Sequence, residues 1–315
     1  MTEPPLRRPF RFSSPATGCN TRRELIDRAK LLEDLGYSAV TIADHFNDQL
    51  GPIATLMAIA DATTSIRIAP MVFSNDYRHP AALAKEAATL DLLSEGRLEF
   101  GLGAGWKASD YATTGITFDD AVERIDRMAE SLSVIKALWA EGPAKVVGRW
   151  YQVDGLEGTP KPFQKPHPPI TVGGGSKRVI QLAGREADIV GFIPSMKAGV
   201  VDAQAGPSAT PAATDRRLEW LRDAAGDRFE HLELQVRLEL ALVTDDPDPL
   251  FETMSGAFGL TPDEGRETPY ALVGPTDHMV EQLERRRDRW GFSYIGVPLD
   301  AADALAPVVA RLAGN

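Results

Sequence analysis

The segment from Arg78 to Trp106, RHPAALAKEAATLDLLSEGRLEFGLGAGW, constrains the fold more than any other part of the chain. Pro80 suits the first turn of a helix, where its missing N–H is harmless. Apolar residues then recur at the spacing of one helix face, at Leu83, Ala87, Leu90 and Leu93. Gly96 ends that helix, and residues 98–102 have the apolar character of a short buried strand. A helix that leads directly into a buried strand is half of the repeat that builds an α/β barrel.

The strand runs into a glycine-rich loop, Gly103-Ala104-Gly105-Trp106. A backbone this bare typically approaches a flat or phosphorylated ligand closely. A second loop, Gly173-Gly174-Gly175-Ser176, stands directly before a predicted helix with Lys177 beside it. Helix N-termini expose unpaired N–H groups that favour a phosphate. Each exposed helix end contributes only ~0.3–1 kcal/mol, so two loops and nearby cations would have to cooperate. Glycine-rich turns also occur without ligands, and this alternative stays open.

Strand and helix signals alternate along the whole chain, which predicts a parallel sheet wrapped by helices. The predicted strands are 10–13, 39–43, 66–73, 98–102, 170–172, 189–192, 233–243 and 294–297. The predicted helices are 21–35, 53–63, 80–93, 125–139, 176–182, 277–290 and 303–312. Eight strands that alternate with helices predict one (β/α)8 TIM-barrel domain over residues 1–315. Two segments are expected to be loop insertions at the barrel mouth, the proline-rich stretch 140–168 and the Ala/Gly/Pro/Ser-rich stretch 195–214.

Composition narrows the class of function. With 43% hydrophobic and 25% charged residues, the chain resembles an average globular enzyme, and no apolar run approaches the ~18 residues of a membrane span. A net charge of −11 disfavours nucleic acid, whose phosphates need a basic surface. The single cysteine, Cys19, cannot form an internal disulfide, and the N-terminus lacks a secretory pattern. We expect a cytoplasmic protein with a small-molecule substrate.

The active site of a (β/α)8 barrel lies where the strands end, so the residues after each strand carry the chemistry. The second strand ends in Asp44-His45, an acid and an imidazole that can exchange a proton near neutral pH. The third strand leads through Pro70-Met71-Val72 to Asn75, whose polar end can bond the edge of a ring. For both segments the alternative is structural, a hydrogen-bonded loop histidine and a buried strand with a solvated turn.

The sequence motifs of several enzyme classes are absent from this chain. There is no nucleotide-hydrolase phosphate loop, no HExxH and no Gly-x-Ser-x-Gly elbow. The five histidines are too scattered in sequence to predict a metal site. We therefore predict no metal.

Taken in order, these segments resemble the luciferase-like flavin and deazaflavin oxidoreductases. The matching pieces are LGYSAVTIADHF at 35–46, APMVFSNDYRHPAALAKEAATLDLLSEGRLEFGLGAGW at 69–106, PKPFQKPHPPITVGGG at 160–175 and ADIVGF at 187–192. The pieces NDYRHP and GLGAGW, with the closing TPYALVGPTDHMVEQLERRRDRWGFSYIGVP, are most similar to the subgroup that uses the deazaflavin coenzyme F420. The resemblance covers nearly the whole chain.

The resemblance implies where a cofactor would lie. It places His45, with Asp44, beside the reactive ring as the catalytic pair, and it implies a non-prolyl cis peptide near Pro70-Met71 behind the ring. The implied cofactor-binding residues are Pro70, Met71, Val72, Asn75, Gly103, Ala104, Gly105, Trp106, Ser109, Gly173, Gly174, Gly175, Ser176 and Lys177. Related sugar-phosphate dehydrogenases carry a glutamate acid where Trp106 stands. Their substrate therefore does not transfer to this chain.

The predicted function is transfer of a hydride between F420 and an unidentified small organic substrate. Three aromatic residues, Trp106, Tyr111 and Trp150, suggest an apolar or planar compound, although they can equally be packing residues. One alternative is an FMN-dependent two-component monooxygenase that uses oxygen and a separate cofactor reductase. Another is a non-catalytic barrel that has lost its cofactor. We expect a homodimer, because dimers are common among the relatives.

Overall fold

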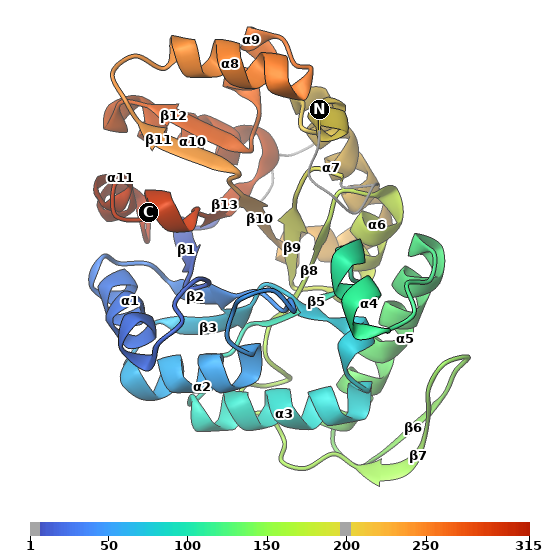
Figure 1. Cartoon of the computed structure of the whole chain (residues 1–315). Coiled ribbons are helices and arrows are strands. Elements are labelled where there is room, and N and C mark those ends of the chain that lie inside the picture. The colour runs from blue at the N-terminus through green and yellow to red at the C-terminus, as the bar shows by residue number, and fades with distance from the viewer. Residues whose placement is uncertain (1–6, 196–202) are drawn as a thin grey trace. The chain divides into compact units, whose positions relative to one another are not determined.

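The computed structural model describes residues 7–195 and 203–315 (Figure 1). Its contacts divide the chain into two compact units, described separately below. Unit 1 is Met1–Pro15, Leu31–Ala39 and Gly173–Asn315, and unit 2 is Ala16–Lys30 and Val40–Val172. The single-domain organisation stays a prediction.

Unit 2 carries the middle of the chain. Its elements in order are most of α1 (Arg22–Asp34), β2 (Ala39–Ile42), α2 (Pro52–Ala62), β3 (Arg67–Pro70), β4 (Phe73–Ser74), the 3-10 helix η1 (Asn75–Tyr77), α3 (Pro80–Leu93), β5 (Phe100–Gly103), α4 (Ala108–Thr114), α5 (Ala121–Trp139), β6 (Pro143–Val147), β7 (Gln152–Glu157) and the start of β8 (Ile170–Gly174). Strand β5 pairs in parallel with β4 and with β8. Strands β6 and β7 form an antiparallel hairpin.

Unit 1 carries the N-terminal strand and the C-terminal part. Its elements are β1 (Arg11–Pro15), α6 (Lys177–Glu186), β9 (Ile189–Phe192), η2 (Ala203–Ser208), α7 (Pro211–Ala225), η3 (Gly226–His231), β10 (Glu233–Arg237), β11 (Leu240–Val243), α8 (Asp248–Phe258), α9 (Pro262–Glu267), β12 (Ala271–Gly274), α10 (Thr276–Trp290), β13 (Phe292–Gly296), η4 (Leu299–Ala301) and α11 (Ala306–Leu312). Strand β13 pairs in parallel with β1 and β10, and β10 pairs in parallel with β9. Strands β11 and β12 form a separate parallel pair.

Parallel strands alternate with helices in both units, as the sequence predicted for an α/β barrel. Strands β2, β5, β9 and β13 are buried along their whole length. Such burial is expected where helices cover a parallel sheet. Among the described residues, no helix is both long enough and apolar enough to cross a membrane.

Helix α3 illustrates how local sequence sets the elements. His79 is its N-cap, and the ring Nδ1 accepts a hydrogen bond from the Ala81 N–H at 3.2 Å. The predicted apolar face is buried at Leu83, Ala87 and Leu90. Leu93, predicted on that face, is instead 60% exposed, because the helix ends there. Gly96, at a φ of +83°, completes the turn.

The two predicted loop insertions contain more regular structure than expected. The stretch 140–168 holds the β6/β7 hairpin, which begins at Pro143. The other prolines of the stretch follow the hairpin, with cis peptides before Pro160 and Pro166. In the stretch 195–214, residues 196–202 lie outside the described residues, whereas η2 and the start of α7 lie within it. Thr210 caps α7 by accepting a hydrogen bond from Ala213 N–H, so the predicted irregular loop is wrong at this end.

Besides the β6/β7 hairpin, the prediction omitted several elements of the two units. Helices α4, α7, α8 and α9 were not predicted, and the predicted strand 233–243 is divided into β10 and β11. Strand β11 leaves the first ladder and pairs with β12. Periodicity alone does not reveal which partner a strand will take.

Candidate active site

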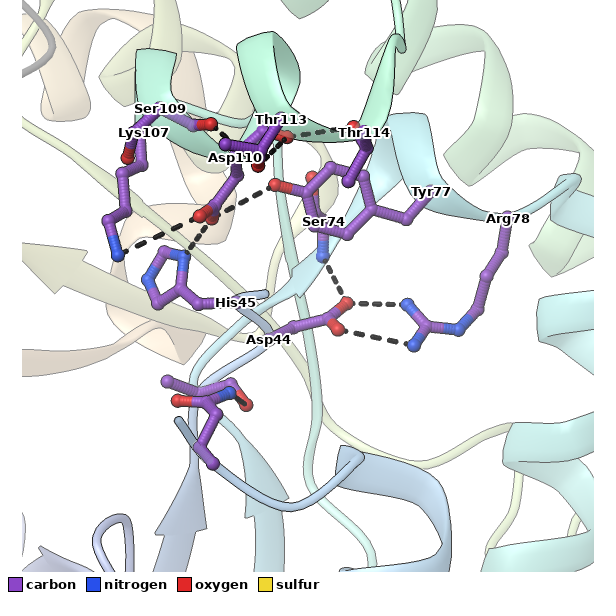
Figure 2. Close-up of polar contacts among 12 residues, drawn as sticks. Asp44, His45, Ser74, Tyr77, Arg78, Lys107, Ser109, Asp110, Thr113 and Thr114 are labelled. Carbon is purple, nitrogen blue, oxygen red and sulfur yellow. Dashed lines mark hydrogen bonds and ion pairs between the residues drawn. The ribbon is translucent and has the colours of Figure 1, made fainter. Parts of the chain in front are cut away.

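The candidate active site lies in unit 2, where β2, β4 and β5 end. The segment after β2 supplies Asp44 and His45, the turn after β4 supplies Tyr77 and Arg78, and the first turn of α4 supplies Asp110. Figure 2 shows these side chains directed toward one another. They come from positions up to 66 residues apart, and parallel packing brings the strand ends together.

The Asp44 carboxylate is buried and fully engaged. Its Oδ2 accepts a hydrogen bond from the backbone N–H of Ser74 at 3.0 Å. Arg78 donates to both carboxylate oxygens, from Nη1 to Oδ2 at 2.5 Å and from Nη2 to Oδ1 at 3.2 Å. Such a two-point guanidinium contact fixes geometry as well as charge. Asp44 therefore holds the end of β2 against the turn after β4.

His45 is held by a different carboxylate, that of Asp110. The distance from His45 Nδ1 to Asp110 Oδ2 is 2.6 Å, and the two side chains are 22% and 4% exposed. An ionised carboxylate only accepts hydrogen bonds, so His45 donates through Nδ1. Among the described residues Nε2 of His45 has no hydrogen bond, and it remains the nitrogen available to a ligand.

Two further groups contact the Asp110 carboxylate. The Tyr77 hydroxyl donates to Oδ2 at 3.2 Å, and Lys107 Nζ lies 3.7 Å from Oδ1 (Figure 2). Burial raises the pKa of the Tyr77 phenol, and the negative charge of Asp110 raises it further. Tyr77 therefore stays protonated near neutral pH and remains a hydrogen-bond donor to Asp110.

Aromatic side chains surround this polar cluster. The Trp106 ring meets the His45 ring edge to face, with centroids 5.7 Å apart. Phe46, which is 55% exposed, packs on Tyr77 with centroids 4.8 Å apart. Apolar surfaces beside an imidazole limit the access of water and suit an apolar or planar ligand.

A second charge cluster, which is partly buried, contacts α4 through Tyr111. The Tyr111 hydroxyl donates to Asp76 Oδ2 at 2.9 Å, and Arg127 bonds both Asp76 and Asp119. Burial raises the pKa of the Tyr111 phenol, and the charge of Asp76 adds to this effect. This cluster fixes α4 and hence the position of Asp110, which precedes Tyr111.

The glycines at the end of β5 and in the loop that follows it leave room for neighbouring groups of the protein itself. A Cβ on Gly103 would lie 2.5 Å from Val72 Cγ2, and a Cβ on Gly101 would lie 2.3 Å from the Pro70 oxygen. Gly105 has a φ of +76°, and its Cβ would lie 1.7 Å from the Tyr111 hydroxyl. Each of these glycines therefore has a packing reason of its own, whether or not a ligand binds there. The peptide Met71–Val72 is cis, one bond beyond the predicted position.

Asn75 is a polar group that lacks a partner. Its side chain is 2% exposed, and its Nδ2 makes no hydrogen bond in the part of the chain that the structure describes. Buried amides are almost always hydrogen-bonded, so a missing partner calls for an explanation. A polar ligand atom would supply it.

The second glycine loop belongs to unit 1. Ser176 caps α6 by accepting a hydrogen bond from Val179 N–H, and a Cβ on Gly174 would lie 2.7 Å from Val179 Cγ1. A Cβ on Gly175 would meet the backbone N of Ser195 at 2.6 Å. Lys177 lies over the Trp220 ring, 5.8 Å from its centroid. Because this loop and His45 lie in different units, a shared site stays a prediction.

Comparison with known proteins identifies the family. A family model described as luciferase-like monooxygenase matches residues 8–205, more than half of the chain. The chain belongs to the luciferase-like monooxygenase family.

Members of this family with different cofactors are similar to the chain. It is 29% identical over 280 residues to an F420-dependent glucose-6-phosphate dehydrogenase of Amycolatopsis mediterranei (strain U-32), covering 84% of this chain and 77% of the relative. It is 24% identical over 257 residues to an FMNH(2)-dependent dimethylsulfone monooxygenase of Pseudomonas putida, covering 80% and 69%. The solved structure of a coenzyme F420-dependent tetrahydromethanopterin reductase of Methanopyrus kandleri matches with a TM-score of 0.76 at 18% identity, covering 97% of this chain and all of that one.

These matches confirm the predicted barrel fold and make the chain an oxidoreductase of the luciferase-like family. Of the predicted catalytic pair, His45 and Asp44 are adjacent in sequence but take different partners. Asp110, Tyr77 and Arg78 were not predicted as site residues. Their contribution depends on α4 and on the turn after β4, and nothing in the local sequence marks Asp110 as a partner of His45.

Two of the three aromatic residues proposed for substrate contact have other roles. Tyr111 is 1% exposed and bonds Asp76, so it is part of the packing. Trp150 donates from its indole N–H to Glu123 and lies under the guanidinium of Arg149. Trp106 alone of the three contacts His45. Among the described residues, no group of three or more His, Cys, Asp and Glu side chains is placed to hold a metal ion.

Proposed function

We propose that this luciferase-like enzyme is an F420-dependent oxidoreductase that exchanges a hydride with a small organic substrate. The observation that carries the proposal is His45, a partly exposed imidazole bonded through Nδ1 to buried Asp110. Its Nε2 is thereby available to exchange a proton next to a redox cofactor. The F420-dependent relatives support the choice of cofactor.

The residues present fit a bound deazaflavin. The buried, unpartnered amide of Asn75 offers a hydrogen bond to a polar edge of the ring system. The backbone from Gly103 to Trp106 and the exposed first turn of α4 at Ser109 would border it. In unit 1, taken by itself, we propose that Gly173 to Lys177 binds a phosphate at the start of α6. When bound, the cofactor supplies two-electron hydride chemistry that no protein side chain provides.

The substrate we propose is an uncharged, apolar or planar compound. Trp106 and Phe46 present aromatic surface next to His45. The two cations in the Asp44 and Asp110 cluster are already paired with carboxylates, Arg78 with Asp44 and Lys107 with Asp110. A sugar phosphate would therefore gain little from them, in line with the tryptophan at position 106.

The proposal is tested by titrating the purified protein with oxidised F420 and, in parallel, with FMN, following tryptophan or ligand fluorescence. We expect selective, saturable binding of F420, weakened in an Asn75→Leu variant, which has no amide to offer. Preference for FMN would favour the second candidate, a two-component monooxygenase with a separate reductase, for which the FMNH(2)-dependent relative is the supporting observation. Failure to bind either cofactor would favour a barrel that has lost catalysis.

We further propose that the protein works as a homodimer in the cytoplasm. Large apolar side chains are exposed at the end of α3, at Leu92 and Leu93, and on the β6/β7 hairpin, at Val147 and Leu156. Exposed apolar surface of this kind is typical of oligomer contacts. Light scattering coupled to gel filtration measures the mass, and a Leu93→Glu, Val147→Glu double variant is expected to shift it toward the monomer.

A further inference from the structure

We propose that Asp110 is the positioning residue for His45, because it fixes the tautomer that presents Nε2 to the substrate. The inference deepens the proposed function, because it assigns the control of the proton-exchanging group. Asp110 itself exchanges no proton and touches no substrate in this scheme.

The contact geometry supports a fixed tautomer. A neutral imidazole carries one proton, and its two nitrogens would compete for that proton if both faced water. The 2.6 Å contact with a carboxylate that is 4% exposed keeps the proton on Nδ1. In each turnover one proton passes between Nε2 and the substrate, while the Nδ1–H and the charge of Asp110 stay unchanged.

The charges around His45 determine in which direction each substitution should shift the protonation of the imidazole. Asp110 places a negative charge beside His45 and so favours the protonated imidazolium, whereas Lys107 places a positive charge 3.7 Å from Asp110 and disfavours it. Tyr77 is neutral, and its hydrogen bond to Asp110 draws on part of the negative charge of the carboxylate. Asp44 lies in the same cluster, but Arg78 balances its charge. Removal of Asp110 and removal of Lys107 must therefore act in opposite directions.

The test measures His45 itself, in the protein without cofactor. The five histidines are labelled with nitrogen-15, and the His45 signals are assigned by their loss in a His45→Gln variant. We expect wild-type His45 to carry its proton on Nδ1 when neutral. In Asp110→Asn, a substitution of nearly the same shape, the tautomers should mix, and the pH midpoint of the imidazole signal should fall because the adjacent negative charge is lost.

Lys107→Met is the opposing variant. Loss of the lysine charge should raise the midpoint, because less positive charge opposes the imidazolium. Thr113→Val is the matched control within α4, since the Thr113 hydroxyl bonds only backbone carbonyls, those of Ser109 and Asp110. It should leave the midpoint and tautomer unchanged.

Three outcomes would overturn the proposal: an unchanged midpoint in Asp110→Asn, a shift of the same sign in both charge variants, or a shift as large in Thr113→Val. If Asp110→Asn does not fold, Lys107→Met decides alone, with an upward shift in support and no shift against.

Activity provides the second measurement. With F420 and a substrate found by screening, Asp110→Asn should lower kcat roughly 10²-fold, leave KM within a few fold, and move the pH–rate profile in the same direction as the imidazole signal. The titration with F420 tests the proposed function separately. If F420 does not bind but the two charge variants shift the imidazole midpoint in opposite directions, the proposed function is wrong and the role of Asp110 stands. If F420 binds but neither variant shifts the midpoint, the proposed function stands and the role of Asp110 is wrong.

Discussion

Two buried carboxylates lie in the candidate active site of unit 2, Asp44 after β2 and Asp110 in the first turn of α4, and their charges are balanced in different ways. Asp44 meets the fork of Arg78 and the Ser74 N–H, so its charge is matched by a permanent cation. Asp110 meets a histidine, a phenol and a lysine 3.7 Å away. A guanidinium keeps its proton at every accessible pH, whereas an imidazole does not. The comparison teaches that the first carboxylate fixes structure, whereas the second is the one that we propose to be coupled to proton chemistry.

The largest expected effect is the loss of turnover on replacement of His45, the imidazole bonded to Asp110. We expect His45→Ala to fold and to lose roughly 10²–10⁴ in turnover, as for loss of a general acid or base. The matched control is His79→Asn, which keeps an acceptor at the N-cap of α3 and should retain activity. Steady-state kinetics measures both variants. Equal turnover in wild type and His45→Ala would remove His45 from the mechanism.

The next effect is a loss of stability, and it tests whether Asp44 has a structural role. Arg78→Met leaves Asp44 buried without its cation, and we expect the free energy of unfolding to fall by about 3 kcal/mol, as for a broken buried pair. Arg78→Lys keeps the charge but loses the two-point contact, so its free energy of unfolding should lie between those of wild type and Arg78→Met. Urea unfolding followed by tryptophan fluorescence measures the series. A variant as stable as wild type would show that Asp44 does not depend on Arg78.

The smallest effect concerns the tyrosine bonded to the second carboxylate. Burial raises the pKa of Tyr77 above its ordinary value of about 10. A raised value in the folded state stabilises the fold fully below pH 10, and this contribution is lost as pH rises above that value. Tyr77→Phe should therefore cost about 1 kcal/mol near neutral pH, and the gap from wild type should narrow above pH 10. A gap that is constant with pH would contradict the prediction.

Much of the barrel was predictable because each repeat carries its own period. Helix α5 is one example, since its predicted stripe at Ile125, Met128, Leu132 and Ile135 is buried. Helix α7 is a counterexample, because the Ala/Pro-rich stretch before it suggested a loop that continues past Pro211. Short stretches rich in small residues have weak periodicity, so tertiary packing decides whether they become helical.

The site was predictable only in part. His45 follows a strand whose end is recognisable, and position alone made it a candidate. Asp110 lies 65 residues away on a short helix that was not predicted. Its role arises because α4 places the carboxylate over the end of β2, and a contact over that distance leaves no periodic trace in the sequence.

The sequence by itself determined the alternation of strands and helices, the glycines and the histidine after the second strand, because these depend on residues within a few positions of one another. Only the tertiary structure decided that Gly103 and Gly105 make room for Val72 and Tyr111, that Arg78 balances Asp44, and that Asp110 binds His45. Hydrogen bonds and ion pairs depend on distances of a few ångströms, and such distances between remote residues exist only after the chain has packed.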